Sequence, residues 1–506
     1  MMMKDAKSAG RPPRVGHASP RFVRDLNFMS SRNIAGHLLL LLFVVALLQD
    51  ANAIASPTLD AFNAAFRPLN PAVTVEPVAG MGHGLVATRD VEAGEVLLSV
   101  PRELTLSPTL YLSEIGSTGP VGAQIAEAGK RLQQTAEGAS CLLALALLHE
   151  RALGERSKRA LYVSMLPQPD SLEHSLLWEP SRVESLLKGS HLVERIRRLR
   201  SDLSREISGL MSDALVHEPA TFPPEVYTEA LYTWAHAILL SRALPVGGDR
   251  ELTLVPLLDF ANHDASSPHV WRAIETSGEQ GFVALVAGSR VVAGEHVCID
   301  CSRGRRRATW EYFFSYGMVP EVSGLSTEES AAHWLEQGAF PMRLDALRPP
   351  EEDAISMQKR ALLALLLDAL GFDESSDELG IEITLTPDAP AAIAPFLRLG
   401  FASRDNAAEL AETLEAWKAA PLDTWEKLQR PLSDENERLV AERVLRICED
   451  ALKPLPPSLG LAMAVVADEP PTEERKRERA AARVLLGERH ALEACRDHWK
   501  QVLEKL

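Results

Sequence analysis

Residues 82–104 read Gly-His-Gly-Leu-Val-Ala-Thr-Arg-Asp-Val-Glu-Ala-Gly-Glu-Val-Leu-Leu-Ser-Val-Pro-Arg-Glu-Leu. Two β-rich runs, residues 84–88 and 96–100, flank a turn at residues 90–94, so this stretch predicts a pair of strands. Its opening also matches the G-x-G-x-x-A pattern of dinucleotide-binding loops. Such a loop must open a helix whose N-terminus faces the pyrophosphate. Because a strand and a turn follow here, we exclude a dinucleotide site of that class.

The glycines at the start of this stretch leave two interpretations open. A glycine-rich strand entry lets the backbone approach a ligand closely, because the Cβ atoms are missing. The same glycines also suit a β-bulge or the corner of a hairpin.

The rest of the chain is organised around this β-rich opening. Helical periodicity dominates the segment that follows, and strands then return before a long helical tail. We predict an α+β fold, in which a β-rich domain is split by a helical insertion and is followed by an all-helical C-terminal domain. The predicted boundaries are a targeting segment at 1–53, a linker at 54–74, the β-rich domain at 75–322 with its insertion at about 105–230, and the helical domain at 340–506. Strands are expected at 252–258, 281–288 and 296–301, and a helix at 225–243.

Composition excludes several classes of protein. The 506 residues are 46% hydrophobic and 24% charged, which is ordinary for a globular protein and excludes wholesale disorder. The formal net charge of −17 argues against nucleic acid as a partner, because phosphate binding requires positive surface. Five cysteines cannot form a disulfide framework in a chain of this length. The pair Cys298 and Cys301 lacks the further ligands of a zinc site, so we expect no metal.

The N-terminus has the layout of a targeting signal. Seven Lys and Arg residues within 1–36 precede an apolar run at 38–48 and then Ala51-Asn52-Ala53. This order is typical of a cleaved signal peptide that leads into the secretory pathway. The run is shorter than a membrane-spanning helix requires. An uncleaved membrane anchor and the first half of a bipartite plastid presequence remain alternatives.

The last helix carries an apolar stripe with seven-residue spacing: Leu485, Leu492, Trp499 and Leu506. Two to three heptads are too few for a stable coiled-coil seam. We therefore expect the stripe to pack onto its own domain and the chain to be a monomer.

The stretch from Gly82 to Leu104 resembles the opening of SET domains of the Rubisco large-subunit methyltransferase type. Four further stretches match that family in the same order. They are residues 157–167 with Trp178 and 187–190, residues 234–244, residues 255–263, and residues 294–321. The resemblance covers about 75–321, and the helical tail resembles the substrate-binding domain of the same family. It implies S-adenosylmethionine as the cofactor, and it implies that the cofactor-binding residues are Gly82, His83, Gly84, Leu85, Arg242, Asp259, Asn262 and His263.

The resemblance also implies individual roles. Asn262 would hold the amino-acid end of the cofactor, and the backbone at His263 would pair with its adenine. Arg242 would bind the cofactor carboxylate with both arms of its guanidinium, while Asp259 would pair with Arg242 or orient the loop. Taken alone, Asn262-His263 also suits a turn, and Arg242 an ordinary ion pair.

One position departs from the family pattern. Ile299-Asp300-Cys301-Ser302 stands where the family has I-x-Y-G, so Cys301 occupies the position of a tyrosine that aligns methyl and amine. We consider Cys301, Tyr312 and Tyr316 as candidate catalytic residues. Either one of the two tyrosines fills the role, or the chain binds the cofactor without transferring methyl. The arginine-rich run 303–307 is either a solvated loop or a patch that favours an acidic substrate segment.

The function that the resemblance implies is methyl transfer from S-adenosylmethionine to a lysine amine of a protein substrate. A histidine N-methyltransferase of the same fold and a SET-like binding protein without catalysis are the alternatives.

Overall fold

The computed structural model describes residues 59–506, apart from 70–71, 79–80, 214, 247–250, 275–280, 303, 306, 320–332, 344–355, 370–381, 403–415, 417 and 459–471. The expected targeting segment, residues 1–53, lies outside the described residues. Within the described ranges, the search for a helix long and apolar enough to span a membrane finds none.

The predicted linker at 54–74 is wrong for most of its described part. Helix α3 (Leu59–Phe66) and a 3-10 turn, η1 (Arg67–Leu69), occupy it. Phe62 and Phe66 are buried in the main hydrophobic core, where Phe62 packs against Phe260 with ring centroids 5.5 Å apart. The prolines around this segment suggested a linker, but the two phenylalanines, four residues apart, give the helix one apolar face that the core covers.

Two small sheets form the β-rich domain. The first has the order β1-β2-β9-β6 and the second β3-β8-β7. The strands are β1 (Val73–Val78), β2 (Gly82–Ala87), β3 (Val96–Pro101), β6 (Asn262–His263), β7 (Val270–Ile274), β8 (Phe282–Val286) and β9 (His296–Ile299). A two-stranded ladder, β4 (Leu244–Val246) with β5 (Glu251–Thr253), lies beside them. β2 and β3, the two strands of the opening stretch, belong to different sheets, so they do not pair as a hairpin.

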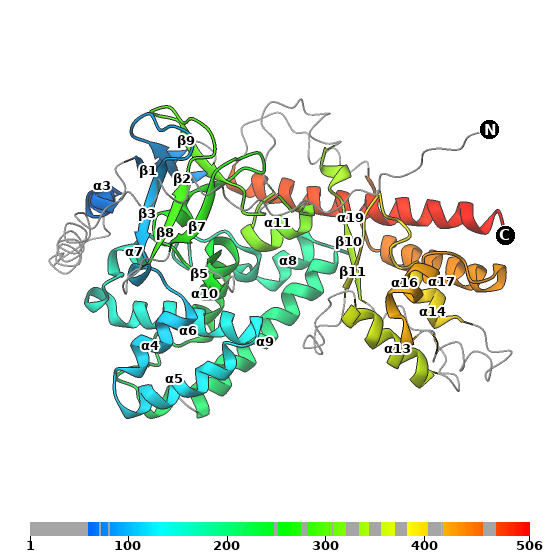
Figure 1. The fold of residues 1–506 in the computed structure, drawn as a ribbon, viewed down its shortest axis with the longest axis horizontal. Coiled ribbons are helices and arrows are strands. Elements are labelled where there is room, and N and C mark those ends of the chain that lie inside the picture. The colour runs from blue at the N-terminus through cyan, green and yellow to red at the C-terminus, as the bar shows by residue number, and fades with distance from the viewer. Residues whose placement is uncertain are drawn as a thin grey trace, which may run out of the picture.

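The helical insertion lies below these sheets in Figure 1 and joins them in one hydrophobic core. Its helices are α4 (Pro108–Gly116), α5 (Pro120–Leu132), α6 (Ala136–Leu153), α7 (Ala160–Met165), α8 (Pro180–Leu186) and α9 (His191–Asp213), with α10 (Glu229–Arg242) following. Helix α6 is buried on most of its surface, which explains its run of leucines and alanines at 142–148.

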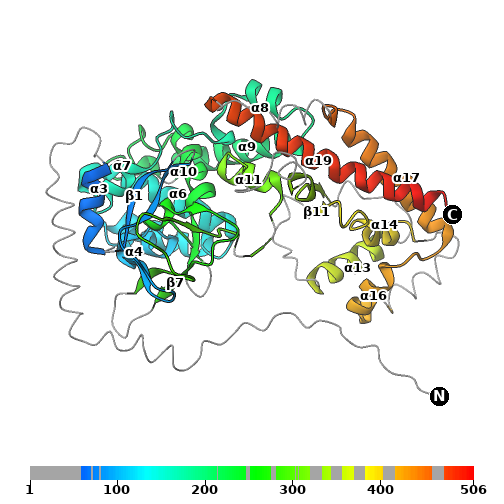
Figure 2. The same cartoon turned by 90° about the horizontal axis from the view of Figure 1, so that it is seen from above.

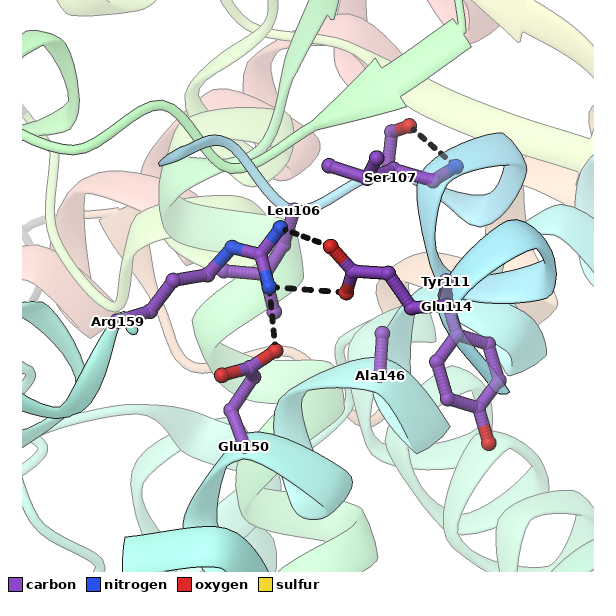
Figure 3. Close-up of a pocket in the computed structure, with 8 residues that line it drawn as sticks. Leu106, Ser107, Tyr111, Glu114, Ala146, Glu150 and Arg159 are labelled. Atoms are coloured by element: carbon purple, nitrogen blue, oxygen red, sulfur yellow. Dashed lines mark hydrogen bonds and ion pairs between the residues drawn. The ribbon is translucent and has the colours of Figure 1, made fainter. Parts of the chain in front are cut away.

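A buried ion cluster fastens the insertion to the sheets. Arg159 binds both oxygens of Glu114 at 3.0 Å and Oε1 of Glu150 at 2.5 Å, as Figure 3 shows. Its Nη2 also donates to the carbonyl oxygen of Glu103, just after β3, at 2.8 Å. The guanidinium therefore links α4, α6 and the end of β3. We assign a structural role to these contacts.

The C-terminal region is mostly helical, as predicted, and contains one unexpected ladder. Its helices are α13 (Ser356–Ala369), α14 (Ala394–Gly400), α16 (Pro421–Leu428), α17 (Asp434–Leu452) and α19 (Glu473–Leu503). The ladder pairs β10 (Phe340–Arg343) with β11 (Glu382–Leu385). Leu485, Leu492 and Trp499 of the apolar stripe are buried against this region's own core, whereas Leu506 lies beyond the helix and is 37% exposed.

Helix α19 joins the two regions. Figure 2 shows it lying along α11 (Thr309–Tyr316) and then along α17. A shared apolar cluster contains side chains of the insertion, of α11 and of α19, among them Trp178, Trp310 and Val484. Beside it, the fully buried Glu488 accepts a hydrogen bond from Ser190 Oγ at 2.6 Å and lies 2.9 Å from His191 Nδ1.

Candidate functional site

Strand β2 is pressed against two side chains at Gly84. A Cβ atom at this position would lie 2.6 Å from His296 Nε2 and 2.7 Å from Asn262 Nδ2. Gly82 has φ +75°, a left-handed conformation that other residues rarely adopt. The glycines therefore permit a close approach, and the nearest groups are polar side chains of β6 and β9. The neighbouring Leu85 is buried, and it pairs with Val297 on β9.

Asn262 lies on the short strand β6, which pairs in parallel with β9. Its Nδ2 contacts His296 Nε2 at 3.1 Å and the carbonyl oxygen of His83 at 3.4 Å. In the described part of the chain no donor reaches its Oδ1. The amide is thus held firmly on one side and has an acceptor oxygen left for a ligand.

The segment that leads into Asn262 is not the strand that the sequence predicted for 252–258. β5 ends at Thr253, and a 3-10 turn, η6 (Leu258–Phe260), follows. Leu257 interrupts the extended backbone, since its φ is +68°, the one positive φ outside glycine among the described residues. Such strained residues persist only where the surrounding structure enforces them, and they are frequent at functional sites.

Arg242, at the end of α10, is tied to Asp259. Its Nη1 donates to the Asp259 carbonyl oxygen at 3.1 Å and lies 3.6 Å from Oδ2 of the same residue. Tyr162 donates to Oδ2 at 2.7 Å, and Oδ1 is buried without a partner in the described residues. Burial raises the pKa of Asp259 to about 6, although Arg242 opposes the rise. These contacts hold α10 against η6. They use Nη1 of Arg242, so Nη2 is left to donate to a ligand.

The second half of the site surrounds His263, the other residue of β6. Its Nδ1 accepts a hydrogen bond from the backbone N–H of Cys301 at 3.2 Å, and its Nε2 lies 3.1 Å from the Tyr312 hydroxyl. The Tyr316 ring is stacked with the His263 ring, with centroids 6.4 Å apart. Burial lowers the pKa of His263, so we assign a neutral imidazole with its proton on Nε2.

Cys301 and Tyr316 lie close enough for each side chain to influence the pKa of the other. Burial raises the pKa of the Cys301 thiol to about 11, so the thiol stays protonated at neutral pH. A protonated thiol is a poor nucleophile. The search for clusters of three or more His, Cys, Asp or Glu side chains that could hold a metal finds none in the described ranges.

Helix α11 positions both tyrosines, which are four residues apart and so lie on one face. The helix ends at Gly317, whose φ of +71° suits a left-handed cap. The buried His174 donates from Nε2 to the Ser315 carbonyl oxygen at 3.2 Å, while its Nδ1 accepts from the backbone of Leu176. Burial lowers the pKa of His174 to about 4, which keeps this anchor neutral.

The structure brings all the sequence-predicted site residues to two adjoining places. The strand that holds Gly82 to Leu85 contacts Asn262, Arg242 is bonded to Asp259 three residues before Asn262, and Cys301, Tyr312 and Tyr316 surround His263. Sequence reasoning missed His296, His174 and Tyr162 as supporting groups. Of these three, only His296 could have been found from the sequence. It lies two residues before Cys298, on the predicted strand that leads to Cys301.

Comparisons with known proteins agree with this architecture. Residues 350–492 match the family of Rubisco LSMT substrate-binding domains, where LSMT is the large-subunit methyltransferase. The chain is 24% identical to the chloroplastic Rubisco large subunit N-methyltransferase of Nicotiana tabacum over 86% of its own length and 78% of that protein. It is 25% identical to the chloroplastic fructose-bisphosphate aldolase-lysine N-methyltransferase of Arabidopsis thaliana, over 84% and 77% of the two chains.

A solved structure shows the same fold. The SET domain of LSMT bound to methyllysine and AdoHcy aligns with 89% of this chain and 93% of its own, with a TM-score of 0.69 and 21% identity. The α+β architecture expected from the sequence is therefore confirmed.

Proposed function

We propose that this chain, a SET-domain protein of the Rubisco LSMT type, transfers a methyl group from S-adenosylmethionine to the side-chain amine of a lysine in a protein substrate. The observation that carries the proposal is the position of β6 between the two halves of the site. Asn262 contacts the glycine-rich strand β2 through His83, and the next residue, His263, contacts Tyr312. The residue assigned to the cofactor and the residue that contacts the tyrosines are thus adjacent in the chain.

The residues on the Asn262 side fit the polar end of the cofactor. When bound, S-adenosylmethionine supplies an activated methyl group on a sulfonium sulfur. The Oδ1 of Asn262 can accept from its amino group, and the guanidinium of Arg242 can bind its carboxylate. The buried Asp259 carboxylate holds Arg242 from behind, so the guanidinium is oriented before the cofactor arrives.

The residues on the His263 side suit the acceptor amine. Methyl transfer is an in-line displacement, so the amine must be neutral and held at near-attack distance. Burial beside the aromatic rings of Tyr312 and Tyr316 would lower the pKa of such an amine. The Tyr316 hydroxyl accepts a hydrogen bond from Arg307 Nη1 at 3.3 Å, so it has a partner in the protein on this face of α11. We therefore assign the aligning hydroxyl to Tyr316, with Tyr312 as the second candidate.

The double substitution Cys301→Tyr with Ser302→Gly restores the family motif. We expect methyl transfer to become at least about tenfold faster, because a second preorganised polar contact is added at the reacting centre. Cofactor affinity should be nearly unchanged, since Asn262 and Arg242 are not altered. Initial rates and calorimetric cofactor affinities check both expectations. If the variant binds cofactor normally yet gains no rate, Cys301 does not occupy the tyrosine position.

The function itself is tested by labelling. The purified chain is incubated with a cell lysate and S-adenosylmethionine carrying a labelled methyl group, and mass spectrometry identifies the modified residue. A labelled lysine supports the proposal. A labelled histidine favours the histidine N-methyltransferase alternative, and cofactor binding without any label favours a binding protein whose Cys301 has removed catalysis.

The substrate and the assembly are also part of the proposal. Two arginines of the run 303–307 contact α11: Arg305 pairs with Glu311 at 2.8 Å, and Arg307 donates to Tyr316. We expect a protein substrate with an acidic segment near the target lysine, bound by a monomer. The C-terminal domain would dock that substrate, as the match to the substrate-binding family supports.

We further propose that residues 1–53 are removed from the mature protein. The two plant relatives are named as chloroplastic, which supports the plastid alternative over the secretory pathway. Intact-mass measurement of the native protein should find no residue before Ile54 at the N-terminus: Ile54 itself after removal of the signal alone, or a later residue after the second cleavage of a bipartite plastid presequence. Recovery of Met1, or of any residue before 50, would contradict cleavage at this site and favour a membrane anchor or a different processing route.

A further inference from the structure

We infer that Arg307 is a specificity-determining residue, which binds an acidic side chain of the substrate next to the target lysine. This inference rests on the proposed function, because it takes the Tyr312–Tyr316 face of α11 as the place where the lysine enters.

Arg307 is turned toward the candidate catalytic tyrosine. Its guanidinium carbon lies 5.6 Å from the centroid of the Tyr316 ring, and Nη1 donates to the Tyr316 hydroxyl at 3.3 Å. That contact is long for a hydrogen bond, and a phenol is a neutral acceptor. The Nε of Arg307 is buried with no acceptor in the described residues. The described groups around Arg307 thus leave its charge only partly compensated.

The charged groups nearby are already engaged elsewhere. Arg305 forms an ion pair with Glu311 at 2.8 Å, and the same carboxylate accepts from the Ala308 backbone at 2.7 Å. Asp300 accepts the backbone N–H of Ser302 at 2.9 Å and that of Gly304. Among the described residues, therefore, no carboxylate lies within ion-pair distance of Arg307. A guanidinium matches a carboxylate in shape and charge, so a substrate carboxylate is the group that would complete it.

The positive charge of Arg307 acts on Tyr312, which lies where the proposed function places the target amine. Burial raises the pKa of the Tyr312 hydroxyl, and Arg307 is the largest influence opposing that rise. The chain as a whole is acidic, with a formal net charge of −17, so its general field repels an acidic peptide. A preference for acidic sequences would therefore have to come from a local positive group, and Arg307 lies beside Tyr316, which the proposed function places at the target lysine.

The test compares two fluorescent peptides, one with Glu-Glu-Lys-Glu-Glu at its centre and one with Gln-Gln-Lys-Gln-Gln. Binding to the full chain loaded with S-adenosylhomocysteine is measured by fluorescence polarisation. We expect the unaltered protein to bind the Glu peptide about tenfold more tightly, as a charge-assisted pair predicts. In Arg307→Gln this preference should fall below about twofold. Arg307→Lys should keep part of it, because the charge remains while the forked geometry is lost.

Arg305→Gln is the matched control, since Arg305 is an exposed arginine of the same loop, and it should leave the preference intact. Equal binding of both peptides by the unaltered protein would overturn the inference. So would a loss in Arg305→Gln as large as that in Arg307→Gln. Arg307→Gln could instead weaken S-adenosylmethionine binding, measured by calorimetry, and leave the peptide preference unchanged. The carboxylate that Arg307 binds would then be that of the cofactor, and the inference would be wrong.

Methyl transfer to the Glu peptide is measured in parallel and judges the proposed function separately. A peptide preference that depends on Arg307, together with no transfer to any acceptor, supports the role of Arg307 in recognition and counts against catalysis. Methyl transfer that is equally fast with both peptides in the unaltered protein supports the proposed catalysis. The same result counts against the role of Arg307 in substrate recognition.

Discussion

Tyr316→Phe is expected to lower the rate of methyl transfer by about 10²-fold while leaving cofactor affinity unchanged. The substitution removes one preorganised hydroxyl from the reacting centre, a loss that typically costs about 10²–10³ in rate. The lower end applies because methyl transfer develops little charge on oxygen. The hydroxyl accepts a hydrogen bond from Arg307 Nη1 at 3.3 Å, so it has a partner in the protein before the substrate arrives. Single-turnover rates with labelled cofactor measure the effect.

Tyr312→Phe is the matched comparison, because it removes the same atom from the same face of α11. The Tyr312 hydroxyl is bonded to His263 Nε2 at 3.1 Å, so we expect a smaller loss, of about tenfold or less, from a shift of the imidazole. A larger loss for Tyr312→Phe than for Tyr316→Phe would reverse the assignment of the two phenols. Calorimetric cofactor affinity should be unchanged in both variants, which separates a catalytic effect from a binding effect.

Asn262→Ala is expected to abolish measurable binding of S-adenosylmethionine and leave the fold intact. Its amide is the partner of His296 Nε2 and of the His83 carbonyl oxygen, and its Oδ1 is the acceptor assigned to the cofactor. The cofactor amino group left without this acceptor costs about 1–3 kcal/mol, which corresponds to a loss of up to about 10²-fold in affinity. Isothermal titration calorimetry measures it, and circular dichroism verifies the fold.

His83→Ala tests whether this cofactor-binding candidate acts through its backbone alone. The His83 side chain is exposed, and only its backbone carbonyl receives the Asn262 amide, so the substitution keeps that hydrogen bond. Its cofactor affinity should stay within about twofold of the unaltered protein. Unchanged affinity in Asn262→Ala would refute the assignment of this strand to the cofactor.

The sequence predicts those parts of the fold that have a local signal. The β-rich run at 96–100 predicts β3, and the leucine-rich periodicity at 142–147 predicts α6, because residue type and spacing within each element carry the signal. Helix α3 escapes prediction, since its burial depends on Phe260, almost two hundred residues away. The β10–β11 ladder escapes it for a similar reason, as each strand is four residues long and needs a distant partner.

In the candidate site too, only the features with a local sequence signal can be predicted. Asn262 and His263 can be placed from a motif, but the turn before them depends on the strained backbone at Leu257, which no residue type signals. The contact of Cys301 with Tyr316 could not be foreseen either, because the loop between β9 and α11 has no periodic pattern. His174 carries no sequence signal for its role, since it anchors α11 from the insertion, across 141 residues of chain.

The apolar cluster shared by the insertion, α11 and α19 determines where the protein can be divided. A chain truncated after residue 322 would keep every candidate site residue but would lose Ala480, Ala481 and Val484, which pack in the same cluster as Trp310 and Phe313 of α11. The helix that carries Tyr312 and Tyr316 would then present its tryptophan to water, and an exposed apolar patch of this kind promotes aggregation. The C-terminal helix is thus part of the folding unit of the β-rich domain. A shortened chain that keeps the candidate site would have to retain α19.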